Sequence, residues 1–317
     1  MKNSVGAIIR EAHHQGLAVP AFNIPYLPMM EPVVQAVTDL DSFALIAVAR
    51  LEWTKFEAKG PAAIAETFFH CQNTNHVRLH LDHIPVIDED NLRVESLSIF
   101  EEAIRVGFDS LMIDGSRLPL EENIQAVRPM VELGHAYGKP VEAELGEVFG
   151  HESDPMTSYE ELYASGKGFT DVEEARRFVK ETGCDWLSVA IGNVHGAIAA
   201  GWKDLKKIEA RLDLERLDQI HQATGIPLVL HGGSGIKVDN VRRAMKFGIA
   251  KINIGTEIRQ AYEGALKETN SIVRAQHAVF ERTCVVLEEF LGVAGIADKI
   301  NINLDVIQAE GQKEAGK

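Results

Sequence analysis

The sequence of 317 residues is poor in features that would each point to a particular class of protein. Cysteine occurs only three times, without a CxxC pair, which argues against a disulfide framework and for a reducing compartment; the positions are Cys71, Cys184 and Cys284. No stretch approaches the roughly 20 apolar residues of a membrane span, and the N-terminal residues contain no apolar signal segment. We therefore expect a cytoplasmic protein.

Positive charge is also scarce. Lysine and arginine number 32 against 47 aspartates and glutamates, which gives a formal net charge of -15. This charge argues against nucleic acid or an anionic membrane as a partner, because both reward clustered basic residues. It does not exclude a small anionic ligand, since a few backbone amides at a helix N-terminus can bind a phosphate.

The remaining composition is that of an ordinary globular protein. Hydrophobic residues make up 45% of the chain and charged residues 25%, which is typical of folded domains. A chain of this length can bury a large core without disulfides, and one α/β barrel with insertions fits it. No segment has the composition of a linker, so we expect a single domain over residues 1–317.

Eight short β-rich runs recur along the chain, each followed by a longer stretch of helical pattern. Most are nearly continuous in apolar residues, as expected of parallel strands covered on both faces. The runs are LAVPAFNI (17–24), FALIAVA (43–49), VRLHLDH (77–83), SLMIDGS (110–116), PVEAELG (140–146), WLSVAIG (186–192), PLVLHGG (227–233) and KINIGT (251–256). Eight alternating units favour an α/β protein with a closed (β/α)8, or TIM, barrel over an open doubly wound sheet. C-terminal helices are expected over about residues 257–300.

The longest interval between predicted strands runs from Gly146 to Trp186. Its first half, EVFGHESDPMTSYEELYASGKG, is polar and contains Gly and Ser, which predicts a long loop over the mouth of the barrel. Its second half contains the amphipathic stretch DVEEARRFVKETGCD. Thr170 or Asp171 can cap the helix that this stretch predicts, and Gly183 can end it.

Polar residues stand at the C-terminal ends of most predicted strands. In a (β/α)8 barrel these ends meet at one rim, where active sites are built. Three predicted strands end in or near a histidine, namely His83, His195 and His231. A single histidine there is more often a hydrogen-bonded structural residue. Three at one rim, accompanied by carboxylates, indicate a divalent metal site for which imidazole favours zinc.

The turn LHGGSG (230–235) lies between an apolar strand and a helical pattern. Its glycines allow a close approach of the backbone, and exposed amides can bind a phosphate. Such a turn is a weak signal alone. Its place after the seventh predicted strand strengthens it, because phosphate sites of barrels often use the loops after strands seven and eight.

Together these motifs resemble those of class II fructose-bisphosphate and tagatose-bisphosphate aldolases. The matching segments follow in family order from about residue 5 to residue 260 and are PAFNI (20–24), HLDH (80–83), SLMIDGS (110–116), VEAELGEVFGHES (141–153), FTDVEEARRFVKETGCDWLSVAIGNVHG (169–196), PLVLHGGSGI (227–236) and KINIGTE (251–257). The combination is specific, whereas any one segment is not. The resemblance implies a divergent metal-dependent aldolase that reversibly cleaves a phosphorylated ketose to dihydroxyacetone phosphate, or a close analogue, and an aldehyde.

The resemblance also implies roles for individual residues. It implies a zinc ion bound by His83, His195 and His231. Asp82 corresponds to the residue that exchanges a proton with the oxygen at the reacting bond, and Glu152 to the one that moves a proton on the donor carbon. Asp114 and Glu144 correspond to carboxylates that support or transiently bind the metal. The residues implied to contact the substrate or its phosphate are Asn23, Gly196, Gly232, Gly233, Ser234, Asn253 and Thr256.

Elementary chemistry agrees with this assignment. Cleavage leaves negative charge, as an enediolate, on the three-carbon donor, and a divalent Lewis acid stabilises it where no Schiff-base lysine exists. Lys251 begins the eighth predicted strand and is expected at the opposite rim. Asp82 alternates with Leu81 along its strand and can therefore point into the barrel. The alternative for Asp82 is a residue that only orients a histidine ligand.

Several positions depart from the family pattern on the acceptor side. HGAIAAGW (195–202) lacks the usual Tyr and Lys-like residue, and ALIAVARLEW (44–53) places Arg50 and Glu52 where Ser or Thr is usual. The cation site is altered as well, so a requirement for a monovalent cation stays open. Arg50 is either a solvated charge or a clamp for an anionic acceptor. We hypothesise that the acceptor is not glyceraldehyde 3-phosphate.

Two other functions stay open. The same zinc and carboxylates could isomerise or epimerise a sugar through an enediolate without cleavage. A non-catalytic, aldolase-like subunit is disfavoured, because such a protein is expected to lose ligands that this chain keeps. In each enzymatic case the partner is a small phosphorylated sugar. The resemblance implies a homodimer or homotetramer formed through the C-terminal helices.

Overall fold

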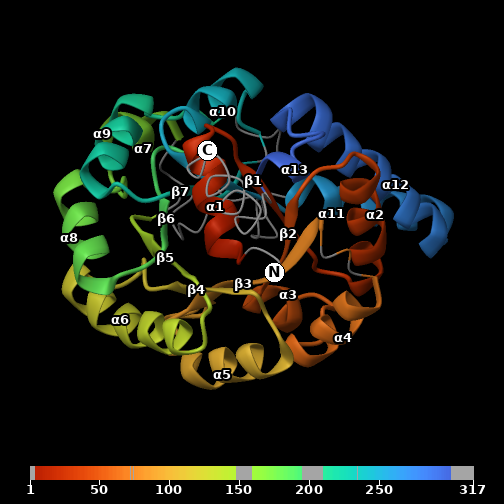
Figure 1. The fold of residues 1–317 in the computed structure, drawn as a ribbon, viewed down its shortest axis with the longest axis horizontal. Coiled ribbons are helices and arrows are strands. Elements are labelled where there is room, and N and C mark those ends of the chain that lie inside the picture. The colour runs from red at the N-terminus through yellow and green to blue at the C-terminus, as the bar shows by residue number, and fades with distance from the viewer. Residues whose placement is uncertain are drawn as a thin grey trace, which may run out of the picture.

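The computed structural model describes residues 4–71, 73, 75–147, 159–194, 210–233 and 235–300. Its centre is a closed barrel of eight parallel strands in chain order, in which β8 pairs with β1 (Figure 1). The strands are β1 (Val19–Asn23), β2 (Ala44–Ala49), β3 (Val77–Pro85), β4 (Ser110–Asp114), β5 (Val141–Leu145), β6 (Trp186–Val189), β7 (Leu228–Leu230) and β8 (Ile249–Ile254). The predicted (β/α)8 barrel is confirmed.

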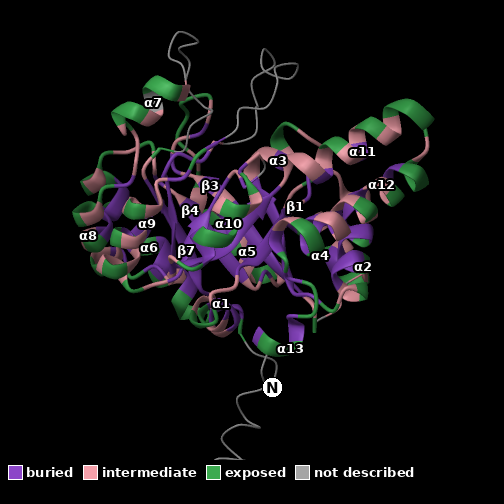
Figure 2. Ribbon diagram, turned by 90° about the horizontal axis from the view of Figure 1, so that it is seen from above, coloured by how far each residue is buried: buried purple, intermediate pink, exposed green. Residues whose placement is uncertain are grey.

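Helices surround the barrel, and α1 lies below it, on the face opposite α3 and α7 (Figure 2). The helices of the described residues are α1 (Val5–His14), η1 (Leu27–Met29), α2 (Met30–Asp39), α3 (Arg50–Thr54), α4 (Pro61–Cys71), α5 (Ser96–Val106), α6 (Leu120–Ala136), α7 (Tyr159–Ser165), α8 (Val172–Thr182), α9 (Leu214–Thr224), α10 (Val238–Met245), α11 (Thr256–Thr269), α12 (Ile272–Val285), the π-helical η2 (Val286–Leu291) and α13 (Ala297–Ile300). The helical C-terminal region predicted over about 257–300 is therefore present.

The strands are buried on both faces, which explains their continuous apolar sequences. Every residue of β2, β5 and β8 is buried. One face packs against the surrounding helices and the other fills the barrel, so alternation with polar residues is not required. Where polar residues do occur within these strands, they therefore lie inside the protein and need partners there.

The helix predicted over DVEEARRFVKETGCD begins and ends as its sequence indicates. Asp171 accepts hydrogen bonds from the backbone N–H groups of Glu173 and Glu174 and so caps α8. Gly183 ends it in the left-handed region, at a φ of 71°. Thr170 has another role, because its hydroxyl donates to the carbonyl of Leu145 at 2.5 Å and so ties α8 to the end of β5.

The prediction of a continuous loop after β5 is wrong in one part. Residues 159–165 form the short helix α7. The hydroxyl of Tyr159 donates to the carbonyl of Gly192 at 3.0 Å, and the ring of Tyr163 lies edge-on to Phe169 at 5.5 Å. These contacts, to Gly192 after β6 and to Phe169 before α8, stabilise a helix whose local sequence resembles a loop. The rest of this predicted loop, from residue 148 to residue 158, lies outside the described residues.

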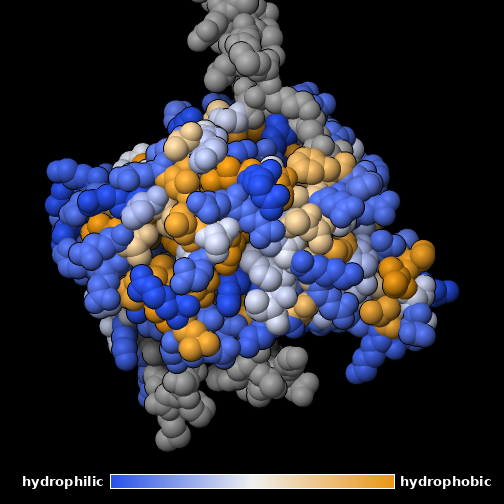
Figure 3. Space-filling model, turned by 90° about the horizontal axis from the view of Figure 1, so that it is seen from below, coloured by the Kyte–Doolittle hydropathy of each residue, from blue (hydrophilic) through white to orange (hydrophobic). Residues whose placement is uncertain are grey.

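The surface of the described residues shows no membrane-spanning element, because none of their helices is long and apolar enough. The face seen from below is mostly hydrophilic, with separate hydrophobic patches (Figure 3). One of these lies at the right edge, where the hairpin of α11 and α12 projects from the barrel. Ile272 and Val273, at the start of α12, are 53% and 74% exposed. This hairpin is therefore a protruding element with apolar residues at its outer end.

Candidate active site

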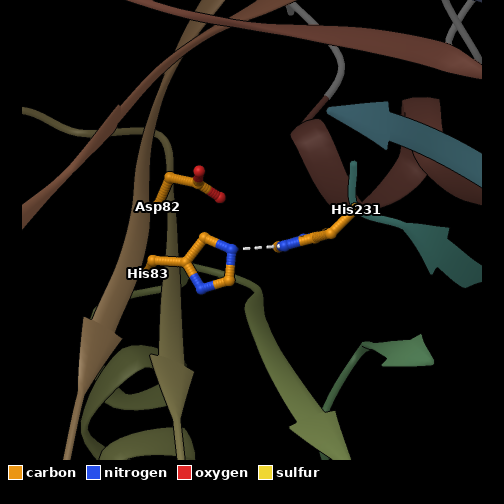
Figure 4. A group of neighbouring side chains, drawn as sticks. All are labelled: Asp82, His83 and His231. Atoms are coloured by element: carbon orange, nitrogen blue, oxygen red, sulfur yellow. Dashed lines mark hydrogen bonds between the residues drawn. The ribbon is translucent and has the colours of Figure 1, made fainter. Parts of the chain in front are cut away.

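A β-bulge near the end of β3 brings two consecutive side chains into the barrel. The pairing of β3 with β4 shifts between Leu81 and Ile84, and His83 has a φ of 35°. Strict alternation would turn His83 away from the side that Asp82 faces. The extra residue of the bulge and the left-handed backbone of His83 remove this constraint, at a cost of about 1–3 kcal/mol in backbone strain. Asp82 and His83 therefore both face His231 at the end of β7 (Figure 4).

The imidazoles of His83 and His231 meet edge to face, with ring centroids 4.3 Å apart. Nε2 of His83 contacts Nδ1 of His231 directly (Figure 4). The outer nitrogen of each ring, the one that points away from the other histidine, contacts a carboxylate. His83 Nδ1 lies 3.2 Å from Asp114, and His231 Nε2 lies 2.8 Å from Glu142. Because an ionised carboxylate only accepts hydrogen bonds, these contacts place the protons on the outer nitrogens. The two inner nitrogens face one another, on the side where a cation can bind.

Glu144 adds a third group to this pair. Its Oε2 lies 3.6 Å from His231 Nδ1 and 3.8 Å from His83 Nδ1. This oxygen is buried and has no hydrogen-bond partner among the residues that the structure describes. A buried carboxylate oxygen left without a partner beside two imidazole nitrogens fits a divalent metal ion. His83, Asp114 and Glu144 also form a second such group, in which all ligand atoms lie within 4.8 Å of one another.

The pKa values of the clustered side chains are shifted in opposite directions. Burial alone lowers the pKa of His83, but the neighbouring carboxylates of Asp82, Asp114 and Glu144 raise it to about 10. Burial and the proximity of Asp114 raise the pKa of Glu144 to about 8. Burial and the charge of His83 lower the pKa of His231 to about 4. Asp82 and Asp114, whose pKa values lie below their ordinary range, thus supply negative charge that a bound cation would balance.

Asp82 is completely buried and is fixed by hydrogen bonds from two asparagines. Asn23 donates to Oδ2 at 2.8 Å, and Asn253 donates to both carboxylate oxygens at 3.0 Å. Burial alone would raise the pKa of Asp82, but the ammonium of Lys251 and the imidazole of His83 hold it well below its ordinary value. Asp82 is therefore ionised and held in one orientation, as a proton acceptor at this site must be.

The expectation that Lys251 lies at the opposite rim is wrong. Its ammonium is fully buried inside the barrel, 2.7 Å from Glu142 Oε2 and 3.7 Å from Asp82 Oδ1. The physical reason is that β8 begins two residues earlier than predicted, at Ile249. Lys251 therefore stands within the strand and on the same face as Asn253, and its long side chain extends to the carboxylates below the site.

The predicted phosphate-binding turn lies against β8. Gly232 has a φ of 67°, and the N–H of Gly233 donates to the carbonyl of Asn253 at 3.3 Å. A Cβ at Gly233 would lie 2.7 Å from Ile252, so only glycine permits this close packing. Thr256 is the first residue of the 14-residue helix α11. The turn after β7 and the N-terminus of α11 thus lie side by side, as a shared phosphate site would require.

Arg50 and Glu52 follow β2 beside β3, where Ala49 pairs with Asp82. Arg50 donates to Asp88 at 3.2 Å, and its other guanidinium nitrogens make no hydrogen bond within the described part of the chain. Glu52 is buried, accepts from the N–H of Ala49 at 2.7 Å and is also hydrogen-bonded to Asn23. Burial raises the pKa of Glu52 to about 8. The guanidinium of Arg50 and the buried carboxyl group of Glu52 therefore lie next to the end of β3 that carries Asp82.

The structure thus brings together most of the candidate site residues that it describes. His83, His231, Asp82, Asp114, Glu144, Asn23 and Asn253 are linked by the contacts above. The candidates His195, Glu152, Gly196 and Ser234 lie outside the described residues. Three further residues of the site have no role in the sequence-based hypothesis, namely Glu142, Lys251 and Asn193.

Asn193 fixes the backbone beside the histidine cluster. It accepts from the N–H of Ile191 at 2.9 Å and donates to the carbonyl of His231 at 3.0 Å. The sequence does indicate which way Glu142 and Lys251 point, because alternate residues of a strand face the same side. Glu142 stands two residues before Glu144, and Lys251 stands two residues before Asn253. This alternation places both side chains inside the barrel, but it does not identify the residues that they contact.

Comparison with known proteins agrees with the fold. Residues 3–312 match the family described as fructose-bisphosphate aldolase class-II. The chain is similar to the YdjI aldolase from Escherichia coli K12, with 30% sequence identity over 93% of this chain and 98% of that one, and a TM-score of 0.73. A fructose-bisphosphate aldolase from Campylobacter jejuni, 18% identical over 93% of this chain and 98% of that one, shares the fold with a TM-score of 0.71. This chain therefore belongs to the class II fructose-bisphosphate aldolase family and is an enzyme of the lyase class.

Proposed function

We propose that the protein is a zinc-dependent aldolase that reversibly cleaves a phosphorylated ketose to dihydroxyacetone phosphate, or a close analogue, and an aldehyde. The observation that carries this proposal is the convergence of His83 Nε2 and His231 Nδ1 beside the ionised carboxylate of Asp82. His195 completes the proposed ligand set. When bound, the metal supplies a Lewis acid that stabilises the negative charge developing on the three-carbon fragment.

Proton transfer is assigned to two carboxylates. Asp82 takes the proton of the hydroxyl group at the bond that breaks, because it is ionised and held by Asn23 and Asn253. In the reverse direction it returns this proton to the new hydroxyl group. Glu152 moves the proton on the donor carbon. Asp114 and Glu144 support the metal, and both lie against His83.

The donor phosphate is proposed to bind between the turn after β7 and the start of α11. Backbone amides at a helix N-terminus attract an anion even in an acidic protein. The residues proposed to contact the phosphate and hydroxyl groups are Asn23, Gly196, Gly232, Gly233, Ser234, Asn253 and Thr256.

The acceptor is proposed to be an anionic aldehyde other than glyceraldehyde 3-phosphate. Arg50 supports this idea because it follows β2 next to Asp82 and uses only one nitrogen, among its described contacts, to bind Asp88. Its remaining N–H groups suit a carboxylate, phosphate or sulfonate.

Self-association is proposed to run through the C-terminal helices, giving a homodimer or homotetramer. The exposed side chains of Ile272 and Val273 on the projecting hairpin support this idea. Exposed apolar side chains that adjoin one another can mark a contact with a partner chain.

The experiment that tests the reaction is deuterium incorporation into dihydroxyacetone phosphate in D2O, followed by NMR. Zinc-loaded and chelator-stripped protein are compared, and no knowledge of the acceptor is needed. Zinc-dependent exchange followed by carbon–carbon bond formation with an added aldehyde is expected. Exchange without bond formation or cleavage for every aldehyde and ketose tested would favour an isomerase or epimerase. No exchange from protein shown to hold zinc would contradict the proposed donor.

A further inference from the structure

A hydrogen-bonded network beneath the histidine cluster contains an ion pair to which the proposed reaction assigns no step. Glu142 on β5 is its centre and accepts three hydrogen bonds. Oε1 accepts from His231 Nε2 at 2.8 Å, while Oε2 accepts from Lys251 Nζ at 2.7 Å and from Trp186 Nε1 at 2.6 Å. Glu142 and Lys251 are fully buried, and His231 and Trp186 are each 1% exposed.

Charge and hydrogen bonding together fix the state of this network. The two groups at Oε2, the ammonium of Lys251 and the indole N–H of Trp186, can only donate, and the buried ammonium pairs with Glu142 at 2.7 Å, so the side chain is an anion. An anionic carboxylate can only accept, so the proton on His231 must lie on Nε2. Nδ1 is then the nitrogen left for the metal, and it is the one that faces His83.

Lys251 holds the carboxylate in place from the other side. Its ammonium contacts Glu142 Oε2 and also lies 3.7 Å from Asp82. A buried carboxylate without a cation would be neutralised or displaced. Without Lys251, Glu142 would lose the charge partner that keeps it an acceptor for His231.

We propose that Glu142 and Lys251 are positioning residues for the metal centre. Glu142 selects the tautomer and ring orientation of His231, and Lys251 keeps Glu142 ionised and fixed. This inference rests on the proposed function, because it concerns the same metal. It goes further in assigning part of the metal affinity to a pair of residues that would not touch the ion.

A purely structural ion pair would behave differently. It would contribute to folding without any effect on how a metal binds to the folded protein. The measurement is therefore the affinity of the folded protein for zinc, by competition with a chromophoric chelator, and the visible spectrum of the cobalt-substituted protein. Both report on the ligand geometry without a catalytic assay.

Three variants and one control test the inference. Glu142→Gln and Lys251→Met each remove one partner, and the double variant E142Q/K251M removes both charges and so avoids an unpaired buried ion. The control is Arg78→Met, which removes a cation that is 6% exposed, at the start of β3, packed over the ring of Phe43. We expect zinc affinity to fall about 10- to 100-fold in all three network variants, as for other groups that orient a metal-bound histidine. The cobalt spectrum is expected to change in these variants and not in R78M.

The outcomes separate the inference from the proposed function. Wild-type protein that binds no zinc would contradict the proposed function. Wild-type protein that binds zinc, with folded network variants that bind it within about twofold as tightly, would overturn the inference alone. If the single variants do not fold, the zinc affinity and cobalt spectrum of E142Q/K251M test the inference. Nitrogen NMR of the wild-type zinc form gives an independent answer, because a proton on Nδ1 of His231 would also overturn the inference.

Discussion

His83 follows Asp82 directly in the chain, and yet both side chains face the same point inside the barrel. The bulge in β3 and the φ of 35° at His83 make this possible. As a result the proposed metal ligand and the proposed proton acceptor are fixed by adjacent residues of one strand. Their separation then depends on backbone geometry more than on flexible side chains, which is the arrangement that precise proton transfer requires.

The first prediction concerns Asp82 as the proton acceptor. Asp82→Asn keeps the size of the side chain but removes the acceptor charge that Asn23 and Asn253 hold in place. Carbon–carbon bond cleavage is expected to slow by about 100- to 10,000-fold, the usual contribution of a positioned acid or base. Zinc content is expected to stay at the wild-type level. A variant that loses its zinc together with its activity would show that Asp82 acts mainly through the metal site.

The second prediction concerns the link between metal and stability. Zinc at about 100 times its dissociation constant stabilises the folded state by about 2.7 kcal/mol. Thermal unfolding of chelator-stripped protein is therefore expected to shift upward by several degrees on adding zinc. His231→Asn is expected to lose most of this shift. His135→Asn is the control, because that side chain is 46% exposed and pairs with Asp185 on the surface. Equal shifts in both variants would place the zinc elsewhere.

The sequence was sufficient for the barrel and for most of its rim. Continuous apolar runs that end in polar residues identify buried parallel strands and their C-terminal ends, and these features are local. The bulge at His83 was not predictable, because an extra residue in a strand leaves no periodic signal. The position of Lys251 was predicted wrongly because strand boundaries are uncertain by a few residues. Its partner Glu142 lies 109 residues away, so only the closed barrel brings them together.

The third prediction uses the pKa of Glu52. Burial raises it from an ordinary value of 4.5 to about 8, so the folded protein keeps a proton that the unfolded chain releases. Stability is therefore lost as the pH rises from about 4.5 to about 8, because over this range only the folded state binds the proton. Glu52→Gln carries no titrating proton and can still accept from Ala49.

The measurement for Glu52 is thermal unfolding of both proteins between pH 5 and pH 8, a window set by the two pKa values. The stability of E52Q relative to the wild type is expected to increase with pH. Glu57→Gln, at an exposed position, controls for the loss of one carboxylate. A constant difference across the range would mean that Glu52 is already ionised in the folded protein.

The fourth prediction concerns self-association through the α11–α12 hairpin. Val273 is 74% exposed, so Val273→Glu is expected to leave the fold intact while placing a charge in the proposed interface. Sedimentation velocity is expected to show a smaller species than for the wild type. Leu97→Glu changes a residue that is 51% exposed on α5 and serves as the control. If both variants sediment like the wild type, the interface does not include this end of the hairpin.

The last prediction concerns the acceptor. Arg50→Ala removes a guanidinium that is only partly used by Asp88, so binding of an anionic aldehyde is expected to weaken by about 10- to 100-fold. Exchange of deuterium into dihydroxyacetone phosphate is expected to stay unchanged, because it involves only the donor. Uncharged aldehydes such as glycolaldehyde are expected to react as with the wild type. Arg105→Ala, at an exposed position on α5, provides a matched loss of charge. If R50A discriminates between charged and uncharged aldehydes as the wild type does, Arg50 is a solvated charge, and the acceptor is recognised by other residues.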